Sequence, residues 1–126
     1  MILVDTDVLI WNLRGNEKAA KLLDRAHGLA LSAVTYMELV QGMRDRRELQ
    51  VLRQAMAFWS ATIVHIDEHI SARASFLIEQ HALAHALQLA DALIAATALE
   101  RGLDLVTGND RHYRAIDGLG IRRFRP

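Results

Sequence analysis

The chain contains no cysteine and a single proline, the terminal Pro126, among its 126 residues. The absence of cysteine excludes disulfide bonds and thiolate metal sites. Because proline is absent from the interior, no proline-rich linker divides the chain. No apolar run approaches the roughly 20 residues that a membrane-spanning helix needs. The N-terminus also lacks the basic region and apolar core of a signal peptide, so we expect a cytoplasmic protein.

The chain also lacks an excess of charge of either sign. Lysine and arginine together number 15, as do aspartate and glutamate, and 13 of the 15 basic residues are arginine. The planar arginine side chain suits bidentate contact with phosphate, although the balanced charge by itself favours no polyanionic partner. Hydrophobic residues make up 52% of the sequence, which is typical of a folded globular protein. At this length we expect one domain over residues 1–126 with one core.

Segments typical of strands and of helices alternate along the chain. The predicted strands are residues 2–5, 29–32, 62–66, 103–107 and 121–124. The predicted helices are residues 7–13, 17–26, 32–42, 44–60, 67–81, 88–99 and 111–116. This alternation predicts an α/β fold with a parallel sheet flanked by helices on both faces.

Asp5 stands where the first predicted strand ends. In α/β folds the carboxyl ends of parallel strands form the crevice in which ligands bind. An aspartate at this position can also simply cap the next helix. The sequence around Asp5 alone does not separate a functional carboxylate from a cap.

Asp91 is the least expected residue of the chain. It lies one turn into the predicted helix 88–99, whose only other polar members are Gln88 and Thr97, so we expect its side chain to be at least half-buried. An ionised carboxylate in such surroundings is costly unless it is paired or bound to a cation. Stabilisation by the helix dipole, worth less than about 1 kcal/mol, is the alternative, and it does not explain the apolar surroundings.

Three further oxygen-bearing side chains occupy similar positions. Glu38 follows Thr35 by three residues, the spacing of a capping box, and Asn109 and Asp110 form a turn after the fourth strand. With Asp5 and Asp91, they lie at strand ends or in first helical turns, which converge at the mouth of an α/β sheet. Clustered carboxylates without cysteine suit Mg²⁺ or Mn²⁺. Such a site can activate water for attack on a phosphodiester.

Four motifs, in order, resemble those of the PIN-domain nucleases, and specifically of the VapC-like toxins of bacterial toxin–antitoxin pairs. The motifs are Val4–Ile10, Ser32–Gly42, Leu89–Leu99 and Val106–Tyr113. The resemblance implies a three-layer α/β/α sandwich with a central, mostly parallel five-stranded sheet, in which the first and fourth strands are neighbours. It implies a Mg²⁺-dependent (or Mn²⁺-dependent) endoribonuclease that cleaves structured RNA such as transfer RNA. A cognate antitoxin and a homodimer are implied as its partners.

The resemblance also implies roles for individual residues. The catalytic set would be Asp5, Glu38 and Asp91, all three as metal ligands, with Asn109 or Asp110 as the fourth member. Thr6 and Thr107 are implied to orient Asp5 or metal-bound water. We also expect eight arginines to contact phosphate unless they are ordinary charged surface: Arg44, Arg46, Arg47, Arg111, Arg114, Arg122, Arg123 and Arg125. We expect apolar surface around Tyr36, Met37, Met43, Phe58 and Trp59 to face a second subunit or the antitoxin. With Asp5 as a ligand, Asp7 becomes the better candidate for the helix cap.

Two other functions start from the same residues. Asp5 and Asp7 resemble the nucleophile and acid/base pair of haloacid-dehalogenase-type phosphatases. That chemistry also uses a lysine late in the chain, whereas the only lysines are Lys18 and Lys21. A PIN fold that only binds a partner is the non-enzymatic alternative. A zinc site at His81 and His85 lacks the glutamate of the metalloprotease motif.

Overall fold

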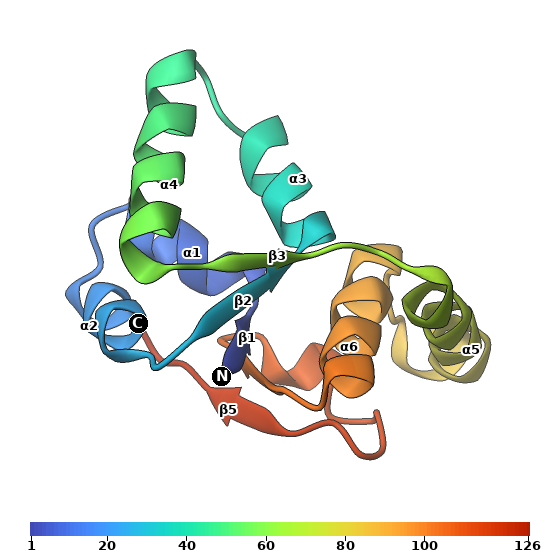
Figure 1. The fold of residues 1–126 in the computed structure, drawn as a ribbon. Coiled ribbons are helices and arrows are strands. Elements are labelled where there is room, and N and C mark those ends of the chain that lie inside the picture. The colour runs from blue at the N-terminus through green and yellow to red at the C-terminus, as the bar shows by residue number, and fades with distance from the viewer.

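The computed structural model describes all of residues 1–126, and a five-stranded parallel sheet forms its centre (Figure 1). The strands are β1 (Ile2–Val4), β2 (Leu29–Ser32), β3 (Thr62–Val64), β4 (Asp104–Thr107) and β5 (Ile121–Arg123). Their order is β3-β2-β1-β4-β5, and every neighbouring pair is parallel. The predicted fold class is therefore confirmed.

Six helices cover the two faces of the sheet. They are α1 (Thr6–Leu13), α2 (Glu17–Arg25), α3 (Ala33–Gln41), α4 (Arg46–Trp59), α5 (Glu68–His85) and α6 (Leu89–Arg101). Figure 1 shows α5 and α6 side by side on one side of the sheet and α1, α2 and α4 on the other. The buried side chains accordingly form two clusters, one with α5 and α6 and one with α1, α2 and α4. No helix combines the length and the apolar character that crossing a bilayer would require.

The central strand β1 is buried on both of its faces. Leu3 and Val4 are each fully inaccessible to solvent, yet Leu3 belongs to the cluster with α5 and α6 and Val4 to the cluster with α1 and α2. Successive side chains of a strand point to opposite faces, so an unbroken apolar run is what a strand covered on both sides requires. The Ile2–Val4 run is long enough to reach both cores before Asp5 begins the next segment.

The sheet order places the carboxyl ends of β1 and β4 next to each other. In the register of this pair Leu3 lies opposite Leu105 and Val4 opposite Val106. The pairing continues one residue further, because the Asp5 N–H donates to the Val106 carbonyl at 2.9 Å. Asp5 therefore emerges beside Thr107 at the point where the strand order changes direction, which is the usual ligand position in open α/β sheets.

Helix α6 packs on the sheet through small side chains. Four alanines of α6 are at most 1% exposed and belong to the same buried cluster as Leu3 of β1 and Leu105 of β4: Ala92, Ala95, Ala96 and Ala98. Alanine has little side chain to separate a helix from a sheet, so these residues allow a close approach. The first turn of α6, which carries Asp91, is thereby held near the end of β1.

Three local predictions are wrong. Asp7 does not cap α1; Asp5 occupies that position, while the Asp7 carboxylate accepts a hydrogen bond from the Gly108 N–H. Thr35 and Glu38 form no capping box, because Ser32, the last residue of β2, already caps α3 by accepting from the Val34 N–H. The helix predicted over residues 111–116 is only a single 3₁₀ turn, η1 (Asp110–His112). In the first two cases a contact across the fold, or a neighbour already in place, determines the outcome.

Candidate active site

Asp5 is the most buried carboxylate of the chain, with 5% of the residue exposed. Its Oδ1 accepts from the Thr6 N–H at 2.8 Å, and its Oδ2 accepts from the Thr107 hydroxyl at 2.7 Å. Burial raises the pKa of Asp5 to about 6, against the lowering effect of the hydrogen bonds from Thr107 and Thr6. All these donors are neutral, so the negative charge of ionised Asp5 has no cationic side chain to balance it.

Asp91 approaches Asp5 through a tyrosine. The Tyr113 hydroxyl lies 3.0 Å from Asp5 Oδ2 and 3.3 Å from Asp91 Oδ1. The Asp91 side chain is 19% exposed, as the apolar surroundings predicted, and its Oδ2 lies 3.6 Å from His112 Nδ1. Two carboxylates from opposite ends of the sequence therefore meet on one hydroxyl group.

Glu38 reaches the site from α3 and is exposed. Its Oε1 lies 2.8 Å from the Thr6 hydroxyl, which also lies 3.0 Å from the Thr35 hydroxyl. Thr6 was expected to orient Asp5, and its backbone N–H does so, whereas its side chain holds Glu38. Glu38 is thus connected to the residue next to Asp5 rather than to Asp5 itself.

The Asp7 carboxylate is not placed for the acid/base role that its spacing to Asp5 suggested for a phosphatase. Its Oδ2 accepts from the Gly108 N–H at 2.8 Å, and its Oδ1 is buried without a hydrogen-bond partner. Burial raises the pKa of Asp7 as well. Both lysines lie on α2 or at its start, not in the late part of the chain where that chemistry needs one. Asp7 instead ties the start of α1 to the turn after β4.

Asn109 and Asp110 differ in how they are engaged. Asn109 is exposed, its side chain makes no hydrogen bond, and its backbone N–H donates to the Thr107 hydroxyl at 3.0 Å. Asp110 Oδ1 lies 3.4 Å from Arg123 Nε, an ion pair that offsets its charge. Asn109 is therefore the member of this turn whose side chain is free to take another ligand.

The acidic side chains are not assembled into a ready coordination sphere. No three aspartate, glutamate or histidine side chains form a group that could hold a metal ion as they stand. The pair Asp5 and Asp91 is brought together, while Glu38 and Asn109 border it. The chemistry of the pair nevertheless fits a hard divalent cation, since both donors are carboxylates and no lysine or arginine lies within 4 Å of either.

Tyr113 is the functional candidate that the sequence analysis did not assign. It was part of the fourth motif but carried no role. A tyrosine directly after a polar turn, in a chain with only two tyrosines, is the one available signal. Its ring is fully buried, and burial together with the two neighbouring carboxylates raises the pKa of its hydroxyl.

The predicted phosphate-binding arginines are all exposed, but several are already paired. Arg44 pairs with Glu48, Arg122 with Asp104 and Arg123 with Asp110. Free of such pairs are Arg46, Arg47, Arg111, Arg114 and Arg125. Of the apolar residues expected at a protein interface, Phe58 and Met37 are well exposed, at 74% and 57%. Trp59 is half-buried, and its indole N–H donates to Asp24.

Known proteins share this sequence pattern and this fold. A family model of the PIN domain matches residues 2–119. The chain is 39% identical over 123 residues to ribonuclease VapC10 of Mycobacterium tuberculosis, with 94% of this chain and 90% of that protein covered. The chain therefore belongs to the PIN-domain family.

Within that family the similarity extends to the VapC-like members named in the sequence analysis. A toxin–antitoxin complex from Klebsiella pneumoniae contains a chain that is 31% identical to this one, with a TM-score of 0.76 and coverage of 94% of this chain and 95% of that one. A DNA-bound VapBC structure from Salmonella typhimurium has a TM-score of 0.84 and 98% coverage of both chains. Its identity is 23%, so that likeness bears on the fold alone.

Proposed function

We propose that this chain is the ribonuclease toxin of a toxin–antitoxin pair, a single PIN domain over residues 1–126 that acts in the cytoplasm on structured RNA such as transfer RNA. The observation that carries the proposal is the convergence of Asp5 and Asp91 on one buried hydroxyl at the switch point of the sheet. The similarity to ribonuclease VapC10 supports the substrate class.

The proposed metal ligands are Asp5, Asp91 and Glu38, with Asn109 completing the site. Mg²⁺ or Mn²⁺ bound there would polarise a phosphate oxygen and lower the pKa of an attacking water. Asp5 is oriented from both sides, by the Thr6 N–H and the Thr107 hydroxyl. Glu38 is held by Thr6 at the exposed edge, where its carboxylate would accept a hydrogen bond from the attacking water. Asn109 has an unpaired amide for the same purpose.

The RNA would approach from the side of the η1 turn. Arg111 and Arg114 are exposed, lie two and five positions after Asn109 and form no ion pair, so they are the best placed of the predicted arginines to contact phosphate. Arg46 and Arg47, at the start of α4, offer a second basic edge. Phosphate contacts position a nucleic acid without reading its sequence.

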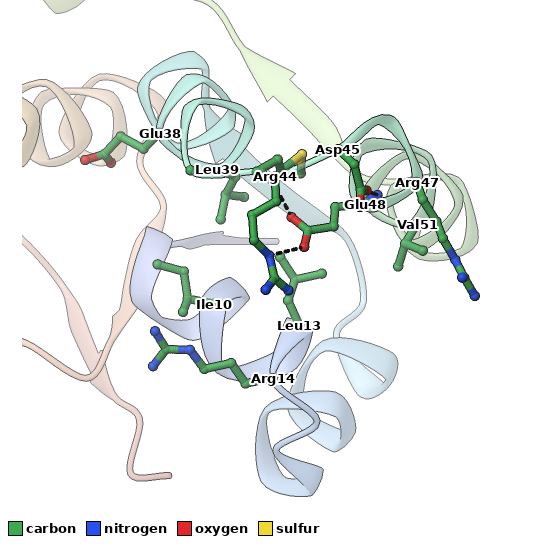
Figure 2. A pocket seen from close by; sticks show the side chains of 12 residues that line it. Ile10, Leu13, Arg14, Glu38, Leu39, Arg44, Asp45, Arg47, Glu48 and Val51 are labelled. Atoms are coloured by element: carbon green, nitrogen blue, oxygen red, sulfur yellow. Dashed lines mark hydrogen bonds and ion pairs between the residues drawn. The ribbon is translucent and has the colours of Figure 1, made fainter.

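A cavity beside the site suits the antitoxin. It measures about 730 Å³ and lies between α1, α3 and α4 (Figure 2). Ile10 and Leu13 of α1, Leu39 of α3 and Val51 of α4 supply apolar surface, and Arg14 and Arg47 supply positive charge at its edge. Glu38 borders the same cavity. An antitoxin segment lying there would cover a proposed catalytic residue, and the toxin–antitoxin complex from Klebsiella pneumoniae, which has the same fold, supports such a partner. A homodimer through the exposed Met37 and Phe58 belongs to the same proposal.

The deciding experiment compares cleavage of bulk transfer RNA by the chain with Mg²⁺ and with EDTA, alongside the variants Asp5→Asn and Asp91→Asn. We expect cleavage only with Mg²⁺, and a loss of at least about 100-fold in each variant, as for the removal of a principal electrostatic group. Asp104→Asn is the matched control, because Asp104 lies at the opposite end of β4. Cleavage that survives EDTA, or that persists in Asp5→Asn, would overturn the proposal. Turnover of a generic phosphomonoester without RNA cleavage would restore the phosphatase.

A further inference from the structure

The Tyr113 hydroxyl is the only side-chain group that contacts both Asp5 and Asp91. Asp5 follows the end of β1, and Asp91 lies in the first turn of α6, 86 positions further along the sequence. Both would carry negative charge, and two carboxylates in a buried place repel each other. Something must therefore fix their spacing, and the phenol is the group in position to do so.

The hydrogen bonds divide the oxygens of the two carboxylates into engaged and free ones. Asp5 Oδ2 faces two hydroxyl groups, that of Thr107 at 2.7 Å and that of Tyr113 at 3.0 Å. Asp5 Oδ1 accepts only from the Thr6 N–H and keeps one position. In Asp91, Oδ1 faces Tyr113, and Oδ2 makes no hydrogen bond, since His112 Nδ1 is 3.6 Å away. One oxygen of each carboxylate is thus left available.

Tyr113 is suited to be a fixed donor in this place. Its ring is fully buried in the cluster that contains Leu3, Ala92 and Ala95, so it cannot turn away without disturbing the core. A phenol has an ordinary pKa of about 10, so this hydroxyl keeps its proton at neutral pH. A hydroxyl has one proton, so it donates to one of the two carboxylates at a time, and a cation bound to their other oxygens would offset the remaining repulsion.

We propose that Tyr113 is a positioning residue of the divalent-cation site: its hydroxyl engages Asp5 Oδ2 and Asp91 Oδ1 and so presents Asp5 Oδ1 and Asp91 Oδ2 to the cation. This inference rests on the proposed function, since it assumes that the cation binds at the two aspartates. Loss of a group that orients metal ligands without touching the metal typically costs about 10-fold to 100-fold in metal affinity or in activity.

The test is Tyr113→Phe, which removes the hydroxyl and keeps the ring. We expect the dissociation constant for Mn²⁺, measured by isothermal titration calorimetry without RNA, to rise about 10-fold to 100-fold. The kcat for RNA cleavage at saturating Mn²⁺ should stay within about threefold of the unchanged chain, because the lost interaction concerns cation binding. Tyr36→Phe is the matched control, since Tyr36 is the other tyrosine and its hydroxyl makes no hydrogen bond to the site; the Mn²⁺ affinity of that variant should be unchanged.

A second measurement covers the case in which Tyr113→Phe fails to fold. With 3-fluorotyrosine in both positions, the chain has two ¹⁹F resonances, and the one that remains in Tyr36→Phe belongs to Tyr113. Titration with Mg²⁺ should shift the Tyr113 resonance and leave that of Tyr36 in place. A Tyr113 resonance that does not move as Mg²⁺ binds would overturn the inference.

The outcomes separate this inference from the proposed function. If the unchanged chain binds Mn²⁺, Asp5→Asn does not, and Tyr113→Phe binds as tightly as the unchanged chain, only the role of Tyr113 is wrong. If the unchanged chain binds no Mn²⁺, or if Asp5→Asn binds it equally well, the cation site itself is wrong and the inference fails with it. Weaker Mn²⁺ binding in Tyr113→Phe with an intact kcat supports both.

Discussion

The Thr6 hydroxyl lies 2.8 Å from Glu38 Oε1, so the residue that follows Asp5 also holds the carboxylate that α3 contributes to the site. Thr6 is half-buried and Glu38 is exposed, and no cationic side chain pairs with this glutamate. A single threonine thus couples the position of Glu38 to the position of Asp5.

Replacement of Thr6 by valine should release Glu38. Valine keeps the branched shape and the backbone N–H that donates to Asp5, so only the hydroxyl is lost. We expect kcat/KM for RNA cleavage to fall about 10-fold, the lower end of the effect for groups that orient metal ligands. Thr6→Ser restores a hydroxyl at the same place and should recover most of the activity. Equal rates for Thr6→Val and the unchanged chain would show that Glu38 needs no such support.

The contact between Asp7 and Gly108 should be visible as an energetic coupling. A Cβ on Gly108 would lie 2.6 Å from Asp7 Oδ2, so Gly108→Ala should lower the free energy of unfolding by about 1–3 kcal/mol. Asp7→Ala leaves the Gly108 N–H without its acceptor and should cost about 1–3 kcal/mol. In the double variant the crowding is gone, so the two losses should fall short of additivity by more than about 0.5 kcal/mol. Urea unfolding of the four proteins measures this, and strict additivity would contradict the contact.

The stability of the cation-free protein should depend on pH through Asp5. Burial raises the pKa of Asp5 to about 6, above its ordinary value of 3.8, so between these pH values the folded chain holds a proton that the unfolded chain releases. The free energy of unfolding therefore falls as the pH rises through this window, by about 3 kcal/mol from this group. Asp5→Asn cannot ionise and should lack that part of the decline. Urea unfolding in EDTA across this window compares the two, and parallel curves would exclude the effect.

Added Mg²⁺ should offset that loss above the window. At neutral pH Asp5 is ionised, and a cation that binds only the folded chain stabilises it in proportion to its occupancy. The melting temperature of the unchanged chain should therefore rise with Mg²⁺ at neutral pH and much less at pH values below the window. Asp5→Asn, which lacks the charge, is the control for nonspecific ion effects.

Contacts of Arg111 and Arg114 with RNA should appear in the salt dependence of binding. If both touch phosphate, the double variant Arg111→Ala/Arg114→Ala should bind more weakly, and the slope of log affinity against log salt should flatten by about 1.4–1.8, or about 0.7–0.9 for each lost contact. Arg101→Ala is the control, because Arg101 ends α6 at the opposite end from Asp91. Binding to catalytically inactive Asp5→Asn protein keeps the RNA intact during the titration. An unchanged slope would remove both arginines from the interface.

The parts of the fold that were predicted from the sequence are those that local patterns determine. The apolar run before Asp5 predicts a buried strand, because burial on both faces needs continuous hydrophobic residues. Asp91 is predicted as a functional candidate because a charged residue inside an apolar helix stands out within a short stretch of sequence. Both residues lie where these patterns placed them, and their convergence on Tyr113 follows from the parallel pairing of β1 with β4 and from α6 packing on the sheet.

The parts that could not be predicted are side-chain contacts between distant segments. Thr6 reaches Glu38 across 32 positions, Asp7 reaches Gly108 across 101, and Tyr113 reaches Asp5 across 108. The spacing of Thr35 and Glu38 matched a capping box, but the chain passes from β2 directly into α3, so Ser32 is already the cap. The spacing of residues along the sequence cannot predict these hydrogen bonds, because the two partners of each bond lie on different elements of the fold.

The small alanine side chains of α6 set how closely this helix packs on the sheet, and so they also set the distance between Asp5 and Asp91. Since α6 carries Asp91 and rests on the sheet that ends in Asp5, a larger residue at Ala92 or Ala95 would lift the helix and separate the acids without touching either. Variants selected for loss of activity should then include some that still fold and that carry their substitution in the core. The packing of the core therefore also determines how far apart the two carboxylates lie.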